Sequence, residues 1–395
     1  MSDHPSKSLL FVQNGDYRDA YMHLKEGGSE TYRDQKRSVD YVAGLAREAK
    51  VTTLALSKTA RREELAPNLW AAGLSYGEAK SSAIAQVFEE AEPTHVLLRT
   101  PHFGFLREAR RRNVHILPNF ADIFERGGPR TAMRNFRMRR ELLKSKAPCF
   151  CNHSLNASRS LIDVLGLPPE KVMPWDWSKV PVGEGPRKAP PDKTQASAFF
   201  AGALSEEKGV GDCLKAVAVL KAQGIRLEMR FAGPGDIAFW QERSRTLDIA
   251  DRVVFLGMIA NGAVREEMSR HDFVIVPSRP AYAEGLPNTI YEALASRSVL
   301  ILSDHPAFTG RLTADEEALI FKAADPNSLA QSIAMVLENG AVYENISENS
   351  AQAHDRLYIG MEWTSLVDAF LADPEDRLGW VARNNLQYWQ SKQTA

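Results

Sequence analysis

The segment from Phe273 to Ser296 constrains the fold most strongly, because it predicts a buried strand followed by a buried helix. Phe273 to Val276 is an apolar run typical of a parallel strand whose sheet is covered on both faces. Pro287 suits the first turn of a helix, where its missing N–H costs nothing. The residues from Pro287 to Ser296 are apolar almost all round, so this helix should be buried. We therefore expect an α/β fold with parallel sheets.

Two glutamates flank the start of this predicted helix. Glu284 precedes it, and Glu292 lies further along it, about 7.5 Å beyond Pro287 at the usual helical rise. The free N–H groups at the start of a helix attract phosphate. The start of this helix is therefore a candidate anion site, with Glu284 before it in the chain and Glu292 after it. A buried carboxylate needs a hydrogen-bond donor, and sugar hydroxyls are donors. The alternative is a pair of solvated glutamates on a surface helix.

The stretch E-G-L-P-N-T-I-Y-E, residues 284–292, resembles the E-x7-E motif of retaining GT-B glycosyltransferases of family 4, the group 1 enzymes. The resemblance extends with good spacing over about residues 198–338 and more loosely over the N-terminal half. It implies a GT-B architecture, in which two Rossmann-like domains face a central cleft. It also implies that Glu284 contacts the donor sugar, that Glu292 takes the ribose hydroxyls, and that the diphosphate is held by the backbone of Gly285, Leu286, Pro287 and Asn288.

The C-terminal half should contain a second parallel sheet, with strands at 198–201, 226–232, 252–256, 273–276 and 299–302. Residues 202–209, G-A-L-S-E-E-K-G, resemble the family's G-R-L-x-x-x-K-G, in which an arginine and a lysine clamp the donor diphosphate. Lys208 keeps the lysine, whereas Ala203 stands in the place of the arginine. Arg279 is a candidate replacement. The plain alternative for Lys208 is an exposed lysine at a helix entry.

The glycines after the second and third of these strands are further candidates for the nucleotide site. Gly233-Pro234-Gly235 superficially matches a dinucleotide fingerprint, but that reading needs an acidic residue about 20 positions later. The chain has Phe255-Leu256-Gly257-Met258 there, so a nicotinamide site is excluded. By resemblance, Gly233 borders the nucleotide, and Gly257 to Ile259 lie near its base.

In the N-terminal half, strands are expected at 8–12, 51–56, 94–99, 114–117 and 147–151, with helices between them. A long loop is expected from Gln13 to about Ser29, and long loops in α/β units are usually functional. It contains Gly15, assigned to the donor, and Gly27 and Gly28, assigned to the acceptor side; a simple turn is the alternative. His102 follows the strand at 94–99, where open α/β sheets place their sites. The family keeps a catalytic histidine near this point, and a helix-capping histidine is the alternative.

Residues 99–146 form a strongly basic segment, with thirteen basic and four acidic residues and a net charge of +9. Met133, Phe136, Met138, Leu142 and Leu143 interleave with its arginines. A basic amphipathic helix can lie on an anionic membrane surface, and many relatives use such a surface to reach lipid-linked acceptors. A solvated basic helix face is the competing interpretation.

The composition of the whole chain limits its partners and its compartment. The sequence has 49 basic and 50 acidic residues, so no overall field points to nucleic acid. Three cysteines do not suggest a disulfide framework, and Cys149 and Cys151 have no second pair to complete a zinc site. No run approaches 18 apolar residues, so no membrane span is expected. We expect a cytoplasmic protein, with the inner face of the membrane as a further possible location.

The expected domains follow from these segments. They are an N-terminal acceptor-side domain at 1–180, a linker rich in proline and glycine at 181–196, a nucleotide-sugar domain at 197–372 and a C-terminal helix at 373–395 that packs back on the first domain.

The expected function is retaining transfer of a sugar from a UDP- or GDP-sugar to a glycan, lipid-linked or small-molecule acceptor, in polysaccharide or glycoconjugate biosynthesis. No D-x-D triplet is present to hold a divalent cation, so we expect no metal and no cofactor besides the nucleotide-sugar co-substrate. The alternative is a GT-B epimerase-like enzyme or a degenerate nucleotide-sugar-binding module, which the alanine at position 203 favours.

Overall fold

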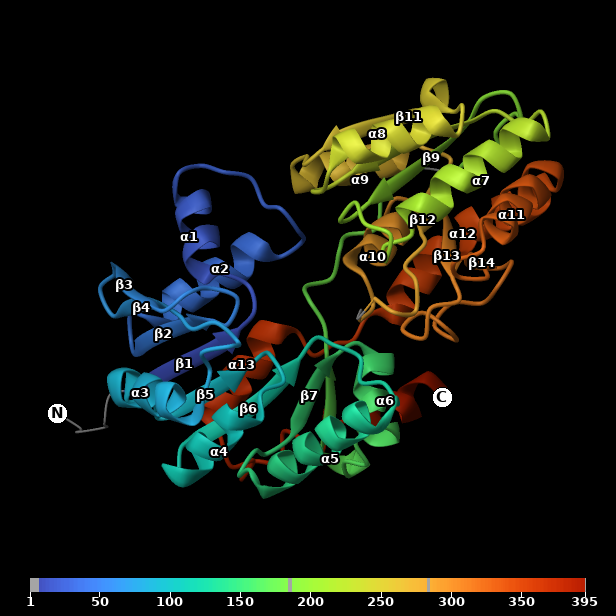
Figure 1. Ribbon diagram of the computed structural model, residues 1–395. Helices are drawn as coiled ribbons and strands as arrows, with labels where there is room; N and C mark the ends of the chain where they lie inside the picture. Colours follow the sequence, from blue (N-terminus) through green and yellow to red (C-terminus); the bar gives the residue numbers. More distant parts are fainter. Residues whose placement is uncertain (1–6, 184–186, 283–284, 395) are drawn as a thin grey trace. The chain divides into compact units, whose positions relative to one another are not determined.

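The computed structural model describes residues 7–183, 187–282 and 285–394, and these fall into two compact α/β units (Figure 1). Unit 1 comprises Met1–Glu30, Asp34–Ser178 and Ile359–Ala395, and unit 2 comprises Thr31–Arg33 and Lys179–Tyr358. Each unit has its own sheet and its own hydrophobic core.

Unit 1 is built on an eight-stranded sheet in the order β3-β4-β2-β1-β5-β6-β7-β8. Its strands are β1 (Ser8–Gln13), β2 (Lys50–Ala55), β3 (Arg61–Ala66), β4 (Leu69–Gly73), β5 (His95–Leu98), β6 (His115–Phe120), β7 (Phe150–His153) and β8 (Val172–Trp175). All pairs are parallel except β3 with β4. Its helices are α1 (Tyr17–Lys25), α2 (Gln35–Leu45), α3 (Ser81–Ala91), α4 (Phe103–Arg111), α5 (Pro129–Lys144), α6 (Leu155–Asp163), the 3-10 turn η1 (Pro169–Lys171), α13 (Trp363–Ala372) and α14 (Leu386–Thr394).

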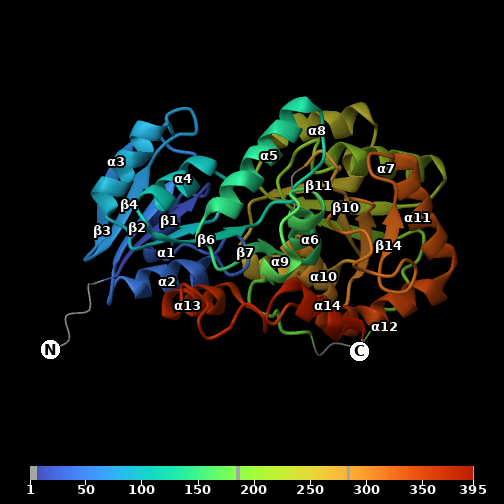
Figure 2. The same cartoon turned by 90° about the horizontal axis from the view of Figure 1, so that it is seen from below.

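Helices cover both faces of this sheet, which explains the apolar character of its central strands. Figure 2 shows α3 and α4 on one face and α1, α2 and α13 on the other. Residues Leu9 to Val12 of β1 are accordingly at most 1% exposed. A strand covered on both faces reads as a continuous apolar run rather than an alternating one, and that pattern is the one from which β1 was predicted.

The C-terminal segment groups with unit 1 because α13 packs against it. The Trp363 ring lies 6.4 Å from that of Phe11, and the Tyr41 hydroxyl on α2 donates to Asp368 over 2.6 Å. The structure therefore divides the chain between residues 358 and 359, whereas the predicted boundary lies between 372 and 373. The apolar periodicity of α13 shows that it is buried but not against which sheet.

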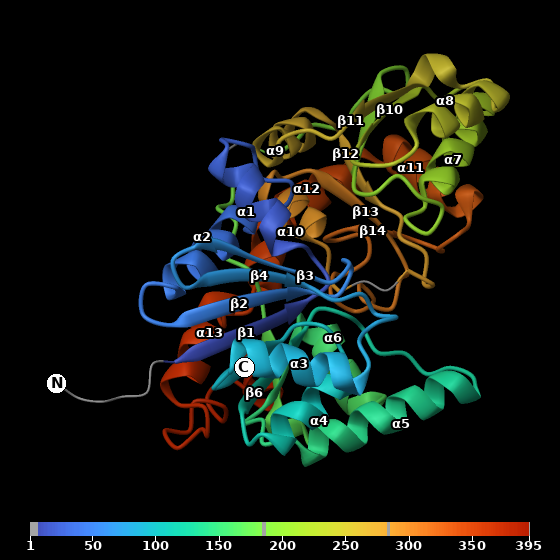
Figure 3. The same cartoon turned by 60° about the vertical axis from the view of Figure 1, so that its left-hand side comes forward.

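Unit 2 is built on a six-stranded, fully parallel sheet in the order β11-β10-β9-β12-β13-β14 (Figure 3). Its strands are β9 (Ala196–Ala201), β10 (Leu227–Ala232), β11 (Val253–Gly257), β12 (Phe273–Val276), β13 (Val299–Ser303) and β14 (Leu319–Phe321). Its helices are α7 (Val210–Ala222), α8 (Ile237–Thr246), η2 (Ala250–Arg252), α9 (Asn261–Arg270), α10 (Asn288–Ala295), α11 (Pro326–Glu338) and α12 (Gly340–Leu357).

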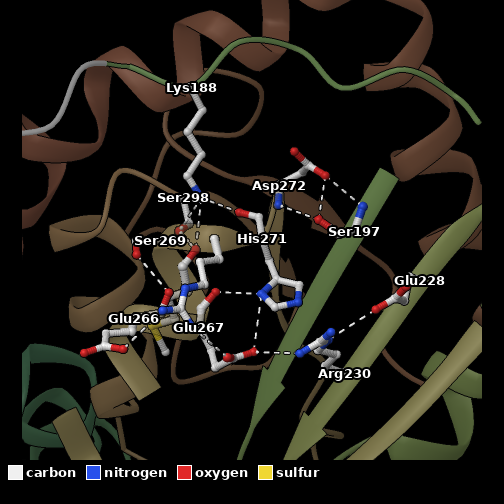
Figure 4. A network of polar contacts seen from close by, with 12 residues as sticks. Lys188, Ser197, Glu228, Arg230, Glu266, Glu267, Ser269, His271, Asp272 and Ser298 are labelled. Carbon is white, nitrogen blue, oxygen red and sulfur yellow. Dashed lines mark hydrogen bonds and ion pairs between the residues drawn. The ribbon is translucent and has the colours of Figure 1, made fainter. Parts of the chain in front are cut away.

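The segment predicted as a linker is fastened to unit 2 by a half-buried lysine, Lys188 (Figure 4). The Lys188 ammonium donates to the carbonyl of Met268 over 2.9 Å, to the hydroxyl of Ser298 over 3.2 Å, and to the carbonyl of His271. These acceptors lie around the end of α9, where free carbonyls and the helix dipole favour a cation. Residues 187 onward are thus part of the compact unit.

A cavity of about 390 Å³ lies beside this network, at the edge of the sheet where β9 and β10 begin. Arg230 and Arg270 line it, and each lies within ion-pair distance of glutamates on β10 or α9. Ligands of open parallel sheets bind at the opposite, carboxyl edge, so we assign no function to this cavity.

The structure corrects the sequence analysis in unit 1. The long loop expected from Gln13 to Ser29 contains the nine-residue helix α1. The strands β3, β4 and β8, and β14 in unit 2, were not predicted. β3 has the sequence R-R-E-E-L-A and lies at the sheet edge, where charged side chains are solvated and protect the edge from pairing, so it carries no apolar run. None of the described helices combines the length and apolar character needed to cross a bilayer.

Candidate nucleotide-sugar site

The carboxyl edge of the unit 2 sheet is shaped by glycines that follow three adjacent strands. The N–H of Gly202, after β9, donates to Ala232 over 2.9 Å, and the N–H of Gly233, after β10, donates to the carbonyl of Gly257 over 2.8 Å. A Cβ on Gly233 would stand 1.9 Å from the Gly202 carbonyl oxygen, and Gly233 has a φ of +142°. Only glycine permits this close approach of two backbone segments, which we call the Gly202–Gly233 crossing. Because neither residue has a side chain, bare backbone faces the space above the strands.

The loop after β10 is held in place by its neighbours. The N–H of Leu204 donates to the Pro234 carbonyl over 2.7 Å, and the indole of Trp240 on α8 donates to the Leu204 carbonyl over 3.1 Å. Asp236 caps α8 by accepting from the N–H of Phe239 over 3.0 Å. The G-P-G-D sequence therefore makes a rigid turn into a helix.

Helix α10 supplies the other wall of the same space. The structure starts this helix at Asn288, with Pro287 as the capping residue, and buries every residue from Ile290 to Ala295. Glu292 is 4% exposed. A pocket of about 140 Å³ is bounded by Thr31–Arg33, Ala201, Gly202, Ala232, Gly233, Pro234, Met258, Ile259, Asn261, Val264, Asn288, Thr289 and Glu292. The structure thus brings together Gly233, Asn288 and Glu292, three of the predicted donor-binding residues, beside the loop that follows Gly257 at the end of β11.

The predicted catalytic Glu284 lies outside the described residues. Gly285 and Leu286, which follow it, are buried. They lead directly into Pro287 and α10, so the backbone predicted to hold the diphosphate stands at the free N–H end of that helix.

Lys208 stands next to the loop that precedes α10. Its ammonium lies 4.4 Å from the centroid of the Tyr282 ring, within the range of a cation–π contact. Gly209 after it caps α7 with a φ of +78°, and a Cβ there would meet the Pro277 carbonyl oxygen at 2.3 Å. This close approach fixes the Lys208 loop against the end of β12.

Arg279, the candidate replacement for the missing arginine, is engaged by carboxylates. Its guanidinium makes a two-pronged contact with Asp212, at 2.8 and 2.7 Å, and lies 3.2 Å from Glu206. Asp212 is 1% exposed, so the arginine neutralises a buried carboxylate in the first turn of α7. The hydrogen bond to Asp212 raises the pKa of Arg279 further above its usual value.

In unit 1, His102 caps α4 through its side chain. Its Nδ1 accepts from the N–H of Gly104 over 3.2 Å, so in the neutral ring the proton sits on Nε2. Burial lowers the pKa of His102, which keeps the ring neutral near pH 7. His102 can therefore cap α4 through Nδ1 and still donate a hydrogen bond to a ligand through Nε2–H.

The glycines predicted in the first loop surround α1. Gly15 precedes the helix, and a Cβ there would meet nothing within 4 Å. Gly27 and Gly28 end it, with N–H groups donating to Leu24 and His23. Gly27 has a φ of +86°, typical of a glycine that terminates a helix, so both residues have a structural role here.

Sequence reasoning missed Thr289 and Gly202 as pocket residues, whereas it expected Met258 and Ile259 near the base. Thr289 lies within 3.4 Å of the Ala201 carbonyl, and Met258 and Ile259 line the pocket on the side of β11. Gly202 had a usable signal, since it follows an apolar strand just as Gly233 does.

The described residues contain no group of three or more His, Cys, Asp or Glu side chains arranged to hold a metal ion. Cys149 and Cys151 are buried, with their sulfurs 3.4 Å apart.

Comparison with known proteins agrees with this architecture. Residues 183–353 match the family described as "Glycosyl transferases group 1". No curated protein sequence matches the chain.

Solved structures show the same fold at low sequence identity. A glycosyltransferase from Rickettsia africae ESF-5 has a TM-score of 0.63 at 12% identity, over 95% of this chain and 99% of that one. Sucrose-phosphate synthase from Thermosynechococcus elongatus has a TM-score of 0.63 at 13% identity, over 93% and 98%. Anabaena Alr3699/HepE in complex with UDP and glucose has a TM-score of 0.63 at 14% identity, over 93% and 100%. The predicted fold class is confirmed: the chain has the two-domain α/β fold of GT-B glycosyltransferases and carries a glycosyltransferase group 1 domain.

Proposed function

We propose that this chain transfers a sugar, with retention of anomeric configuration and without a metal ion, from a UDP- or GDP-sugar to an acceptor hydroxyl. The observation that carries the proposal is the pocket at the carboxyl edge of the unit 2 sheet. There the Gly202–Gly233 crossing, the start of α10 and the buried Glu292 face one space. Its bare backbone suits a nucleotide, and its buried carboxylate suits a ribose.

Each part of the donor has a matching group. Glu292 accepts hydrogen bonds from the ribose hydroxyls, which offset the cost of burying its charge. The N–H groups at the start of α10 and the Lys208 ammonium bind the diphosphate. Met258 and Ile259 lie beside the base, with Gly257 before them. The Anabaena protein was solved with UDP and glucose, which supports a uridine donor.

The transfer step exchanges one glycosidic bond for another. The bond from the anomeric carbon to the diphosphate oxygen breaks, and the acceptor oxygen bonds to that carbon on the same face. The acceptor proton passes to the departing phosphate, so no protein nucleophile is needed. Negative charge grows on the diphosphate, where Lys208 and the α10 amides bind it most tightly in the transition state. His102 Nε2–H, and Glu284 by resemblance, orient the donor sugar.

One observation favours the second candidate, a degenerate nucleotide-sugar-binding module or an epimerase-like enzyme. Ala203 supplies no charge, and Arg279 is already paired with Asp212. The proposed cationic contact to the diphosphate then rests on Lys208. Fewer cations on the diphosphate mean less stabilisation of the leaving group.

For the acceptor, we propose a lipid-linked glycan reached from an anionic membrane surface, at the inner face of the membrane. Met133, Phe136 and Leu143 of α5 are 53%, 59% and 43% exposed. Basic side chains of the same helix surround them. Glu141 is 2% exposed and lies within 3.2 Å of Arg107, Arg110 and Arg140, which holds α5 against α4. Apolar side chains among arginines are typical of a helix that lies in a bilayer interface.

The test measures binding of UDP, GDP and ADP to the full chain by calorimetry, with and without Mg²⁺. We expect one nucleotide to bind independently of Mg²⁺, and Glu292→Gln to weaken it by about 10-fold or more, the value of a charged hydrogen bond. Glu338→Gln, at the exposed end of α11, is the matched control. If no nucleotide binds, the proposal is refuted.

Product analysis by NMR separates the two candidates. Retained configuration in a new glycoside supports transfer, and a changed free sugar indicates epimerisation. Nucleotide binding without either product indicates a binding module. Flotation with phosphatidylglycerol vesicles tests the membrane contact, which Phe136→Glu should abolish.

A further inference from the structure

The unit 1 sheet has a switch point between β1 and β5. From β1 the chain runs to β2 on one side, and after β4 it returns to place β5 on the other side of β1 (Figure 1). In open α/β sheets, ligands bind in the crevice that such a reversal leaves at the carboxyl ends of the strands. Asn14 follows β1 and His102 follows β5, so both stand at this crevice.

An exposed tyrosine reaches this crevice from a third loop. Tyr76 follows β4, and its hydroxyl donates to Oδ1 of Asn14 over 2.6 Å. Its ring centroid lies 6.3 Å from that of His102. Tyr76 is nevertheless 51% exposed. The hydroxyl is anchored while much of the side chain stays open to solvent, so the ring is held in position for a ligand.

The groups around Tyr76 suit a neutral, hydroxyl-rich ligand. Burial raises the pKa of Tyr76, and the negative charge of Asp122, two residues beyond β6, adds to that rise. The hydroxyl therefore stays protonated and donating. His102 adds no positive charge here, because burial lowers its pKa. Asn14 offers an amide and Asp122 a carboxyl group, so both hydrogen-bond donors and acceptors are present near the tyrosine.

The arginine at the end of β5 is already engaged by other side chains, which argues against an anionic ligand. The Arg99 guanidinium at the end of β5 stacks over the ring of Trp363 at 4.7 Å and over that of Trp177 at 5.6 Å. It also donates to the Gln13 side chain over 3.1 Å. A phosphate at Tyr76 would face Asp122 and lack this arginine.

We propose that Tyr76 is the stacking platform for the acceptor and that the group it receives is a pyranose ring. The C–H face of a pyranose is apolar and packs on an aromatic ring, while its hydroxyls both donate and accept. Asn14 positions the platform. The inference rests on the proposed transferase function and specifies its acceptor: the sugar ring, rather than a bare lipid or amino acid, carries the hydroxyl that is glycosylated.

The test uses saturation-transfer NMR on the full chain with the methyl α- and β-glycosides of glucose, galactose and mannose, in the presence of UDP. Tyr76→Ala should lower the affinity for the glycoside that binds by about 10-fold, equivalent to about 1.4 kcal/mol. Tyr76→Phe keeps the aromatic ring and should change the affinity for the glycoside less than 3-fold. Phe239→Ala removes an aromatic side chain of similar exposure, 46%, from α8 and is the matched control.

Separate measurement of UDP affinity distinguishes the two proposals. If UDP binds and no methyl glycoside does, or if Tyr76→Ala binds the glycoside as the wild type does, the platform is refuted and the donor site stands. If a glycoside binds through Tyr76 and no nucleotide binds, the platform stands and the transferase proposal fails. A melting curve for each variant shows that it is folded.

Discussion

Replacing Gly233 by alanine tests whether the backbone crossing at the carboxyl edge of the unit 2 sheet is required. The new Cβ would lie 1.9 Å from the Gly202 carbonyl oxygen, more than 1 Å inside the closest contact that real side chains make. The residue would also keep a φ of +142°, which costs an L-residue about 1–3 kcal/mol. Relieving the clash by a backbone shift adds about 1–3 kcal/mol.

The combined cost is about 4 kcal/mol, because both effects act at one residue. For a unit of this size, about 1 kcal/mol lowers the melting temperature by about 2–4 °C, so a fall of about 8–16 °C is expected. The shift moves the loops after β9 and β10, which line the pocket, so UDP affinity should fall by about 10-fold or more. Calorimetry measures both quantities, as the melting temperature of unit 2 and the dissociation constant for UDP.

Gly224→Ala is the matched control, because it separates strain from collision. Gly224 has a φ of +76°, yet a Cβ there meets nothing within 4 Å. It lies in the turn between α7 and β10, at the other edge of the sheet, so its variant should lose about 1 kcal/mol and bind UDP normally. Equal melting temperatures and equal UDP affinities for the two variants would refute the argument from the crossing.

Two further predictions concern charges. Arg279→Leu leaves the buried carboxylate of Asp212 without its arginine and should destabilise unit 2 by about 3–5 kcal/mol. The control, Lys193→Met, breaks an exposed ion pair and should cost less than about 1 kcal/mol. Urea denaturation measures both free energies of unfolding, and equal losses would contradict the structural role given to the Arg279–Asp212 pair. The guanidinium of Arg111, with that of a neighbouring arginine, lowers the pKa of Glu108 to about 2. This folded-state pKa lies below the unfolded value of about 4.3, so the ion pair stabilises the fold fully above about pH 4.3 and loses that effect as the pH falls toward 2. Glu108→Gln should therefore make the melting temperature depend less on pH between these two values. An unchanged slope of melting temperature against pH would contradict this role of Glu108.

Five of the six strands of unit 2 could be predicted from sequence because they depend on local periodicity, whereas the three-residue edge strand β14 was missed. β12 lies where the apolar run places it, and α10 begins one residue after the predicted start. Burial of Glu292 was also predictable, since its neighbours along the helix are apolar on every side. These features need only the spacing of apolar residues and the helix-starting property of Pro287.

Contacts between segments distant in sequence were decided by the tertiary structure alone. Nothing in the sequence near Arg279 shows that Asp212 already holds its guanidinium, 67 residues away. Likewise, Tyr76 and Asn14 are 62 residues apart and meet only because β4 and β1 end at one edge of the sheet. Periodicity records whether a side chain is buried, and the order of strands in the sheet determines which side chains it meets.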